Sequence, residues 1–533
     1  MMYDWANSAH SVIVVTILPI FYNTVAEYTG DAVSSMSTWG YATSAAMAIV
    51  ALLAPVLGVF GDFEGWRKKL FTGFMLVGVV SCLGLAAAPA LPFTQPGVAE
   101  RVGLLVLSLY ILSTLGFAGA NLYYDSFLTD VTTEERMDQV STMGYGLGYI
   151  GGSTIPLLIF LIMNAVGVPM LTCLSFIFGF TGVWWLVFSF PMLKNVHQAS
   201  GVPREKGAVG RALRGLGGTL KEIAAHKDML VYLLSYFFYI DGVNTIIHMS
   251  TTYGDMLGLD STAMMLALLM VQMLGLPFCL LYIRLSSRFG ARAMVGFGIG
   301  VYMFTCVFGF FMHSAWQFWV LAFLVATSQG GIQALSRSMF GKMIPDKKRS
   351  GEFFGFYDIF GKFSAIMGPS LVGVVSGVMA QRELTARGLT QATATAEQIA
   401  QVNAAAAPWG ILSILLIFFV GGGLYFLVLP RCLNKESANR KMHSISEKER
   451  AAFPQRGERR VMRVWAGQDR PCGRADSQCW CGACRPVKLK FGLEDPTPRF
   501  HSGNRWPGLR EEAGPFRFAR GHSPPAGHEC ADT

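Results

Sequence analysis

The chain has 533 residues, of which 52% are hydrophobic and only 14% are charged, and its mean hydropathy is +0.42. A soluble protein of this size carries about a quarter charged residues, so the composition excludes an ordinary soluble domain and indicates a polytopic membrane protein. The formal net charge of +9 does not indicate a nucleic-acid partner, because the basic residues fall mainly in loops and in the tail, where the positive-inside rule accounts for many of them.

About twelve stretches are apolar over the roughly 20 residues that a membrane span requires. Spans are expected at 3–25, 39–60, 70–89, 102–122, 140–166, 169–191, 229–250, 263–285, 293–312, 316–335, 355–379 and 409–429. A polar segment, 194–227, divides them into two sets of six. We therefore predict an all-α integral membrane fold, with an N-terminal half (1–193) and a C-terminal half (228–430) as parallel repeats and 194–227 as a cytoplasmic linker.

The basic residues of the loops fall on one side of the predicted spans. They comprise Arg67, Lys68, Lys69, those of the linker, Arg284, Arg288, Arg292, Lys347, Lys348 and Arg349. By the positive-inside rule this side is cytoplasmic, and both termini lie on it.

The first basic loop combines glycines, a carboxylate and a basic pair between two apolar runs. Gly58 and Gly65 allow a close approach of helices, and Asp62 is able to meet a helix N-terminus or an Arg across a moving interface. With Arg67 and Lys68, these residues are predicted to control conformation as a gate. The pattern resembles the loop between the second and third helices of the major facilitator superfamily, although Phe63 and Trp66 replace its usual basic residues.

A D-x-x-N spacing occurs near the start of both halves, as Asp4 with Asn7 and as Asp241 with Asn244. Residues three apart share a helix face, and a carboxylate with an amide in an apolar span predicts a substrate or coupling-ion site. The alternative for Asp4 is an interfacial helix cap, and for Asp241 a structural hydrogen-bond anchor between helices.

Other polar residues lie within the predicted spans. Gln333 is assigned to the substrate or coupling-ion group. Asp125 and Arg337 sit near the cytoplasmic ends of their spans, where they either form gates between the halves or snorkel to the interface. Asp358 and Lys362 are spaced i, i+4 and are expected to pair with each other as structural residues.

Four motifs narrow the resemblance to the vacuole effluxer-like branch of that superfamily. They are Y-D-W-A-N-S-A at 3–9, Y-Y-D-S-F-L-T-D at 123–130, G-Y-G-L-G-Y-I-G-G at 144–152 and G-G-I-Q-A-L-S-R-S at 330–338. The resemblance implies a twelve-helix facilitator that exports small solutes, with amino acids as the favoured substrate class. It implies a bacterial cell membrane, or a vacuolar membrane in a eukaryote. Family members usually have a short segment before the first motif, so a truncated or misassigned start is expected here.

The tail from 431 to 533 is rich in Arg, Gly, Pro and Cys and has no hydrophobic period. Its C-x-C-x-x-C at 479–484, with Cys472 as a fourth thiolate, is the pattern to consider for zinc, but paired C-x-x-C knuckles are missing. We predict no metal site and a disordered tail, as an out-of-frame translation would also give.

No Walker loop and no convincing nucleophile with an acid–base partner are found, so we predict no enzyme activity and no cofactor. The predicted function is a monomeric secondary active transporter for a small solute, driven by a proton or cation gradient and working by alternating access. The alternatives are a receptor or scaffold without transport, and a facilitator for lipids.

Overall fold

The structure, a computed structural model, describes residues 1–28, 32–203, 205, 207–390 and 393–432. Within these ranges the chain is almost entirely helical, and one isolated bridge joins Phe63 to Val202. The Cys-rich stretch 472–484, with its alternative interpretation as a zinc site, lies outside the described residues, as does almost all of the predicted tail.

The helices of the N-terminal group are α1 (Met2–Thr16), α2 (Leu18–Glu27), α3 (Ala32–Gly61), α4 (Arg67–Ala87), η1 (Ala88–Ala90), α5 (Pro96–Ser126), α6 (Leu128–Val131), α7 (Glu134–Leu147), the π-helix η2 (Gly148–Thr154), α8 (Ile155–Ala165) and α9 (Met170–Asn195). Those that follow are α10 (Ala208–Ala225), α11 (Lys227–Met256), α12 (Ser261–Phe289), α13 (Ala291–Phe310), α14 (Ala315–Met343), η3 (Lys347–Arg349), α15 (Ser350–Ala386), α16 (Ala396–Gly423) and η4 (Leu424–Val428). The break between α1 and α2 falls beside Pro19, because proline has no N–H for the helical ladder.

Twelve helices of the described residues are long and apolar enough to cross a membrane, which confirms the predicted fold class. Several reach further than the sequence predicted: the fourth runs over Gly97–Val131 and the tenth over Ala315–Met343. The extra turns lie at the end that carries the basic loops, where the helices become polar and the apolar run that marks a span stops.

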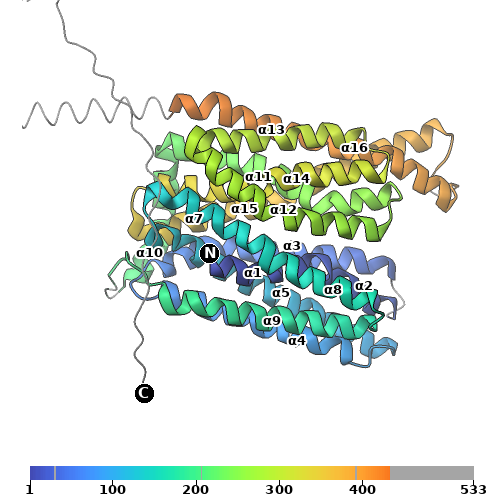
Figure 1. Ribbon diagram of the computed structural model, residues 1–533, viewed down its shortest axis with the longest axis horizontal. Coiled ribbons are helices and arrows are strands. Elements are labelled where there is room, and N and C mark those ends of the chain that lie inside the picture. The colour runs from blue at the N-terminus through green and yellow to red at the C-terminus, as the bar shows by residue number, and fades with distance from the viewer. Residues whose placement is uncertain (29–31, 204, 206, 391–392, 433–533) are drawn as a thin grey trace, which may run out of the picture. The chain divides into compact units, whose positions relative to one another are not determined.

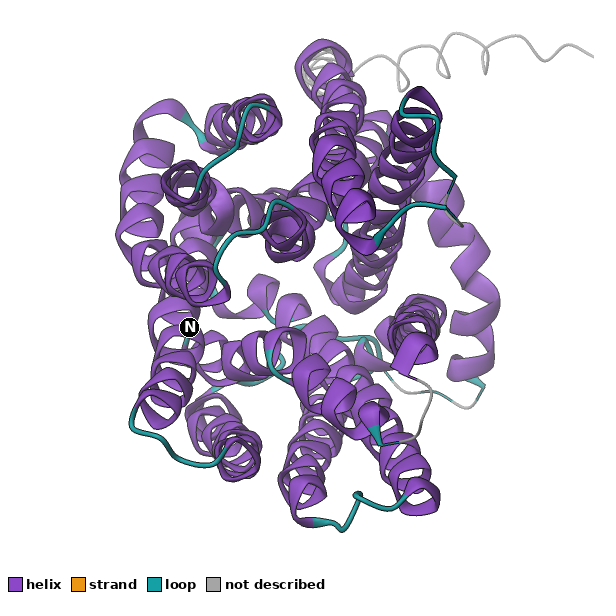
Figure 2. Cartoon of the chain, turned by 90° about the vertical axis from the view of Figure 1, so that its right-hand side faces the viewer, coloured by secondary structure: helices purple, strands orange, loops and turns teal. Residues whose placement is uncertain are grey.

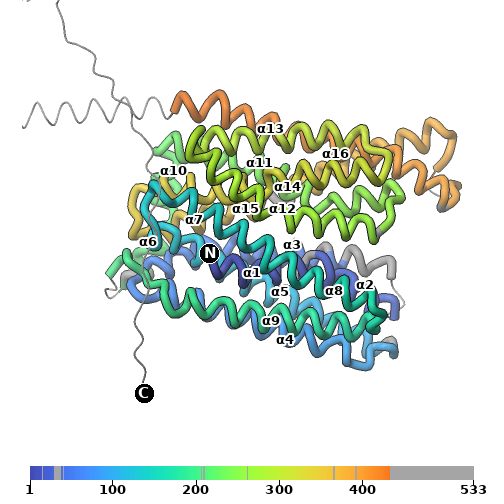
Figure 3. Tube along the Cα trace, in the orientation of Figure 1, coloured from blue at the N-terminus to red at the C-terminus, as the bar shows by residue number. Residues whose placement is uncertain are grey.

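The helices fall into two groups. Figure 1 shows α1–α9 on one side and α11–α16 on the other, with α10 at the left-hand end. Figure 2 looks along the helices and shows the two groups facing each other, and the colours of Figure 3 separate them in sequence.

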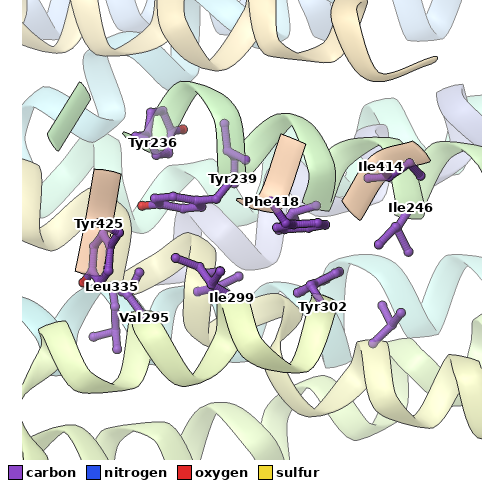
Figure 4. Close-up of a cluster of buried hydrophobic side chains, with 14 of the residues drawn as sticks. Tyr236, Tyr239, Ile246, Val295, Ile299, Tyr302, Leu335, Ile414, Phe418 and Tyr425 are labelled. Carbon is purple, nitrogen blue, oxygen red and sulfur yellow. The ribbon is translucent and has the colours of Figure 1, made fainter. Parts of the chain in front are cut away.

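Each group has its own hydrophobic core. In the C-terminal group the core includes Tyr239 and Ile299, with Phe418 and Tyr425 packing from α16 and η4 (Figure 4). The buried hydroxyl of Tyr239 hydrogen-bonds to Ser336 Oγ at 2.7 Å. The main cores of the N-terminal group are built from α1–α9. Since each core closes within its own group, most of the apolar burial survives when one group moves against the other.

Six of the twelve spans, an even number, lie between the linker and the end of the last span, so these two points are on the same side of the membrane. We expect reporters fused within 194–227 and after Arg431 both to signal from the cytoplasm, because the basic loops lie on that side. A fusion after Thr94, between η1 and α5, is the matched control and should signal from outside. An external signal from either of the first two fusions would overturn this orientation.

Candidate functional site

The two groups of helices meet in a buried charge cluster around Arg337, which is only 4% exposed and projects from α14. Its Nη1 donates to Oδ1 of Asp125 on α5 at 2.8 Å and lies 3.7 Å from Oδ1 of Asp4 on α1. Its Nε donates to the hydroxyl of Ser141 on α7 at 3.0 Å, and Nη2 to the Ser141 carbonyl oxygen at 3.3 Å. Three helices of the N-terminal group therefore hold one guanidinium of the C-terminal group.

Two tyrosine rings enclose the same guanidinium. Its Cζ lies 5.4 Å from the ring centroid of Tyr124 and 4.8 Å from that of Tyr145, both within cation–π range. The Tyr124 hydroxyl donates to Oδ2 of Asp4, and the exposed amino group of Met1 lies 3.5 Å from that oxygen. All three guanidinium nitrogens of Arg337 are thus in use.

Asn7 and Gln333 lie near this cluster and make contacts of their own. The Asn7 amide donates to Oδ1 of Asn121 on α5 at 2.6 Å. The hydroxyl of Tyr149, in the π-helix η2, reaches Oε1 of Gln333 on α14 at 3.4 Å. A Cβ at Gly275 of α12 would lie 2.6 Å from the Tyr149 ring, so this glycine lets the two groups approach closely. π-Bulges are frequent at functional sites.

Asp241 lies in a different environment from Asp4. It is fully buried in the middle of α11, and its Oδ1 accepts a hydrogen bond from the Gly368 N–H of α15 at 2.9 Å. Its Oδ2 has no partner among the described residues, and Asn244 is only partly buried. Asp4, in the first turn of α1, contacts the opposite group instead. The D-x-x-N spacing therefore does not place equivalent carboxylates at equivalent depths, and the contact of Asp241 matches the alternative of a helix anchor.

Asp62 of the α3–α4 hairpin binds the N-terminus of α15. Its oxygens accept from the backbone N–H groups of Gly351 at 2.7 Å and Glu352 at 2.8 Å, and from Arg67 Nη2 at 2.9 Å. A carboxylate here also interacts favourably with the dipole of α15. Burial raises the pKa of Asp62 to about 7, whereas Arg67 and the two backbone N–H groups act to lower it. The predicted meeting of Asp62 with a helix N-terminus is present.

Arg67 ties the hairpin to the end of α5. It is fully buried, donates to the Gly61 and Ser126 carbonyl oxygens at 3.2 and 3.3 Å, and pairs with Oδ2 of Asp130 at 2.6 Å. Lys68, one residue on, is only partly buried and forms no ion pair with the described residues.

The glycines of the hairpin have two different roles. A Cβ at Gly58 would overlap the carbonyl oxygen of Gly351, so this pair brings α3 and α15 into backbone contact. Gly65 has φ of 73°, a left-handed conformation that favours glycine, and it shapes the turn.

The linker also binds this end, a contact that the sequence pattern did not predict. The hydroxyl of Ser200 donates to Oδ1 of Asp130 at 2.6 Å and to the Lys347 carbonyl oxygen at 3.3 Å, so it touches both groups. The Val202 N–H donates to the Asp62 carbonyl oxygen at 2.8 Å.

Helix α10, the next part of the linker, also binds the end with the basic loops. Arg349 donates to Glu222 at 2.8 Å and to Glu352 at 3.1 Å. Thr219 of α10 donates to Glu352 and accepts from Arg349. The one sequence signal for this contact is the recurrence of apolar residues in 208–225 at helical spacing, which indicates a helix with a buried face.

Three further contacts join the groups at the same end. Ser338 and Lys342 of α14 contact Asp138 of α7, each at 2.7 Å, and Lys347 pairs with Glu134 at 2.7 Å. The structure thus shows the end with the basic loops closed by polar contacts.

A sequence profile of the family described as "Vacuole effluxer Atg22 like" matches residues 1–137 and 129–381. A Bacillus subtilis protein, the uncharacterized MFS-type transporter YxiO, is 44% identical over 384 residues, which are 70% of this chain and 87% of that protein. Autophagy-related protein 22 of Saccharomyces cerevisiae is 25% identical over 381 residues, which are 60% of this chain and 69% of that protein.

Solved structures of the major facilitator superfamily share the fold. The proton:xylose symporter XylE has a TM-score of 0.54 at 15% identity, covering 78% of this chain and 92% of XylE. The human organic anion transporter MFSD10 has a TM-score of 0.56 at 13% identity, covering 80% of this chain and 97% of that one. At these identities the likeness concerns the fold alone. The family match over most of the described helices, together with the bacterial relative, shows that the chain belongs to the vacuole effluxer Atg22 like family of major facilitator transporters.

Proposed function

We propose that this protein is a secondary active transporter that exports a small solute, with amino acids as the substrate class, and that a proton or cation gradient drives it. The observation that carries the proposal is the insertion of Arg337 from one group of helices between Asp125 and Asp4 of the other. A buried ion pair across a moving interface is strongly held when formed, and it is sensitive to any change in the charge of one partner.

Alternating access requires two bodies that rock about a central site. The separate hydrophobic cores supply the two bodies, and the polar contacts at the end with the basic loops supply a gate that breaks and re-forms. Gly58, Asp62, Gly65, Arg67, Asp125 and Arg337 are the proposed gating residues, with Lys68 contributing positive charge to the loop. By the positive-inside rule, this closed gate faces the cytoplasm.

The charge balance of the cluster supports coupling to a cation. Two carboxylates, Asp4 and Asp125, face the guanidinium of Arg337, so the buried part carries an excess negative charge when both are ionised. The Met1 amino group is exposed, and water screens its charge. A proton or a metal cation entering the cluster would neutralise the excess and weaken the hold on Arg337. Asn7 and Gln333 are the neighbouring polar groups available to a solute or ion.

The direction and the substrate class rest on the family. Its description names effluxers, which supports export. The amino-acid class follows from the resemblance carried by the motifs at 3–9, 123–130, 144–152 and 330–338. Export from the cytoplasm agrees with a gate that closes on the cytoplasmic side once solute has left.

Asp4→Asn should abolish gradient-driven accumulation while keeping downhill exchange, because Asn carries no negative charge and the ion pair with Arg337 is lost. Asp241→Asn should keep both activities, since Asn Oδ1 accepts the same bond from Gly368. The measurement is uptake of tritiated amino acids into proteoliposomes with and without a proton gradient, where we expect a loss of about tenfold or more for Asp4→Asn.

The reverse result, coupling lost in Asp241→Asn and kept in Asp4→Asn, would move the coupling site to α11. No flux by the wild-type protein above empty vesicles would favour the scaffold alternative.

Arg337→Met should destabilise the closed conformation by about 3–5 kcal/mol, because two buried carboxylates lose their cation. We expect a lower unfolding temperature in detergent and faster thiol labelling of a Cys placed at Ser338. Arg382→Met, on an exposed residue of α15, is the control and should change neither. Equal labelling rates in the two variants would show that Arg337 does not hold the gate.

Gate closure should depend on pH through Asp62. In the closed conformation the pKa of Asp62 is about 7, whereas a hydrated Asp in an open conformation has a pKa of about 4. The closed conformation therefore binds a proton at Asp62 more tightly than the open one. The contribution of Asp62 to closure is therefore largest at low pH and is lost as pH rises from about 4 to about 7, which is opposite in sign to the effect of a proton at the Arg337 cluster. Hydrogen exchange of the Gly351 and Glu352 amides, corrected for intrinsic rates, should be slower at about pH 5 than at about pH 8. The difference should vanish in Asp62→Asn; if it persists there, another group controls the gate.

A further inference from the structure

A second ion pair, between Asp358 and Lys362 of α15, is partly buried and takes no part in the gate. Lys362 Nζ lies 3.7 Å from Asp358 Oδ1, and the two side chains are 23% and 25% exposed. The pairing predicted from their spacing is therefore present. Its surroundings, however, differ from those of a pair that only stabilises its own helix.

Asp358 faces the opposite group of helices. It borders a small cavity of about 10 Å³ whose other lining residues are apolar and come from α3, α4 and α5, among them Leu57, Phe74 and Leu122. Its Oδ2 is buried without a hydrogen-bond partner among the described residues. This free acceptor is available to a hydrogen-bond donor that enters the cavity.

Lys362 has N–H donors that its ion pair with Asp358 does not use. Its described ion pair is the one to Asp358, so two of its three N–H groups remain for another acceptor. Arg67 and Arg337 are the buried arginines of the interface. Their guanidinium nitrogens already donate to the gate contacts described above. Lys362 is therefore the intramembrane cation best able to accept a new anionic partner.

The pair lies beside α11 and faces α5. The Tyr236 hydroxyl lies against the backbone of Gly361, and the Tyr236 ring stacks on Tyr357 with centroids 4.3 Å apart. Helix α15 packs along α11, and Asp358 borders the cavity that α5 helps to line. The pair thus stands between the Arg337 cluster and α11, on the surface along which the groups separate.

We propose that Asp358 and Lys362 form the recognition site for a zwitterionic α-amino acid, with Asp358 receiving its ammonium and Lys362 its carboxylate. An α-amino acid carries both charges on one carbon, at a spacing close to that of the ion pair it replaces. In the empty site, Asp358 and Lys362 neutralise each other. In the occupied site, each of them pairs with the opposite charge of the amino acid, so neither state leaves an unpaired charge in the membrane. The apolar lining from α3–α5 favours a neutral, apolar side chain. This inference rests on the proposed transport of amino acids.

The cavity beside Asp358 holds no more than about one water molecule, so the site is closed in this conformation. Separation of α3 from α15 opens it. Recognition and the gate are then linked, since the same α15 that carries the pair begins at the Gly351 N–H groups bound by Asp62.

The test is uptake of a mixture of tritiated proteinogenic amino acids by the full-length protein in proteoliposomes. Asp358→Asn, Lys362→Gln and the double variant should each lose about tenfold or more of the uptake, with insertion unchanged. Each single variant leaves one charge of the pair without a partner, which could impair folding. The double variant leaves no such charge, so a loss of uptake in it reports lost recognition. Glu383→Gln and Arg387→Gln, which break the matched i, i+4 pair at the exposed end of α15, should transport as the wild type does.

Unlabelled leucine should inhibit this uptake, whereas isocaproate, which lacks the ammonium, and isoamylamine, which lacks the carboxylate, should not. Normal uptake by the Asp358 and Lys362 variants, or inhibition by the two analogues as strong as by leucine, would overturn the site and leave the proposed transport intact. A wild-type protein that moves no amino acid would overturn the proposed function and this site together.

Discussion

The buried guanidinium of Arg337 is the constraint on which the rest of the interface depends. A charge at the centre of a bilayer costs about 2.5–3.5 kcal/mol on insertion scales, so an intramembrane Arg needs partners in every conformation that the protein visits. Here its partners, Asp125, Asp4 and Ser141, belong to the opposite group of helices. The two groups are therefore held together where those partners lie, and any movement that separates them must first supply a substitute for the lost contacts.

The chemistry of the interface makes this attachment reversible. Apolar side chains pack mainly within each group, so separation of the groups exposes little of either core. At the closed end the backbones of Gly58 and Gly351 touch, which lets Asp62 reach the N–H groups of α15 without a long side chain. Hydrogen bonds of this kind exchange with water when the end opens, and the net free-energy change per bond is about 0.5–1.5 kcal/mol. A gate built this way closes firmly through many contacts, each of which breaks at low cost.

The sequence predicts the spans and the hairpin well because both have local signals: an apolar run of membrane length, and glycines with charges between two such runs. It fails where partners are distant in the chain. No local sequence pattern predicts that Asp130 binds Ser200 or that Glu352 binds Thr219. These hydrogen bonds depend on how the linker folds back onto the helices. Asp4 and Asp241 share the D-x-x-N spacing but have different partners, for a related reason. Spacing reports a shared helix face, whereas depth and neighbours decide what that face meets.

One short segment, residues 125–130, contacts both Arg337 and the α3–α4 hairpin. Asp125 binds Arg337, the Ser126 carbonyl oxygen accepts from Arg67 and from the Ser350 hydroxyl, and Asp130 binds Arg67. The six residues from 125 to 130 run from the last turn of α5 through the short helix α6, so they shift as a unit when α5 rotates. A change of charge at Asp125 that frees Arg337 therefore also moves the carbonyl and carboxylate oxygens that hold the hairpin. Residues 125–130 therefore connect the Arg337 cluster to the hairpin directly along the chain. A longer route through the lipid-facing helices is not required.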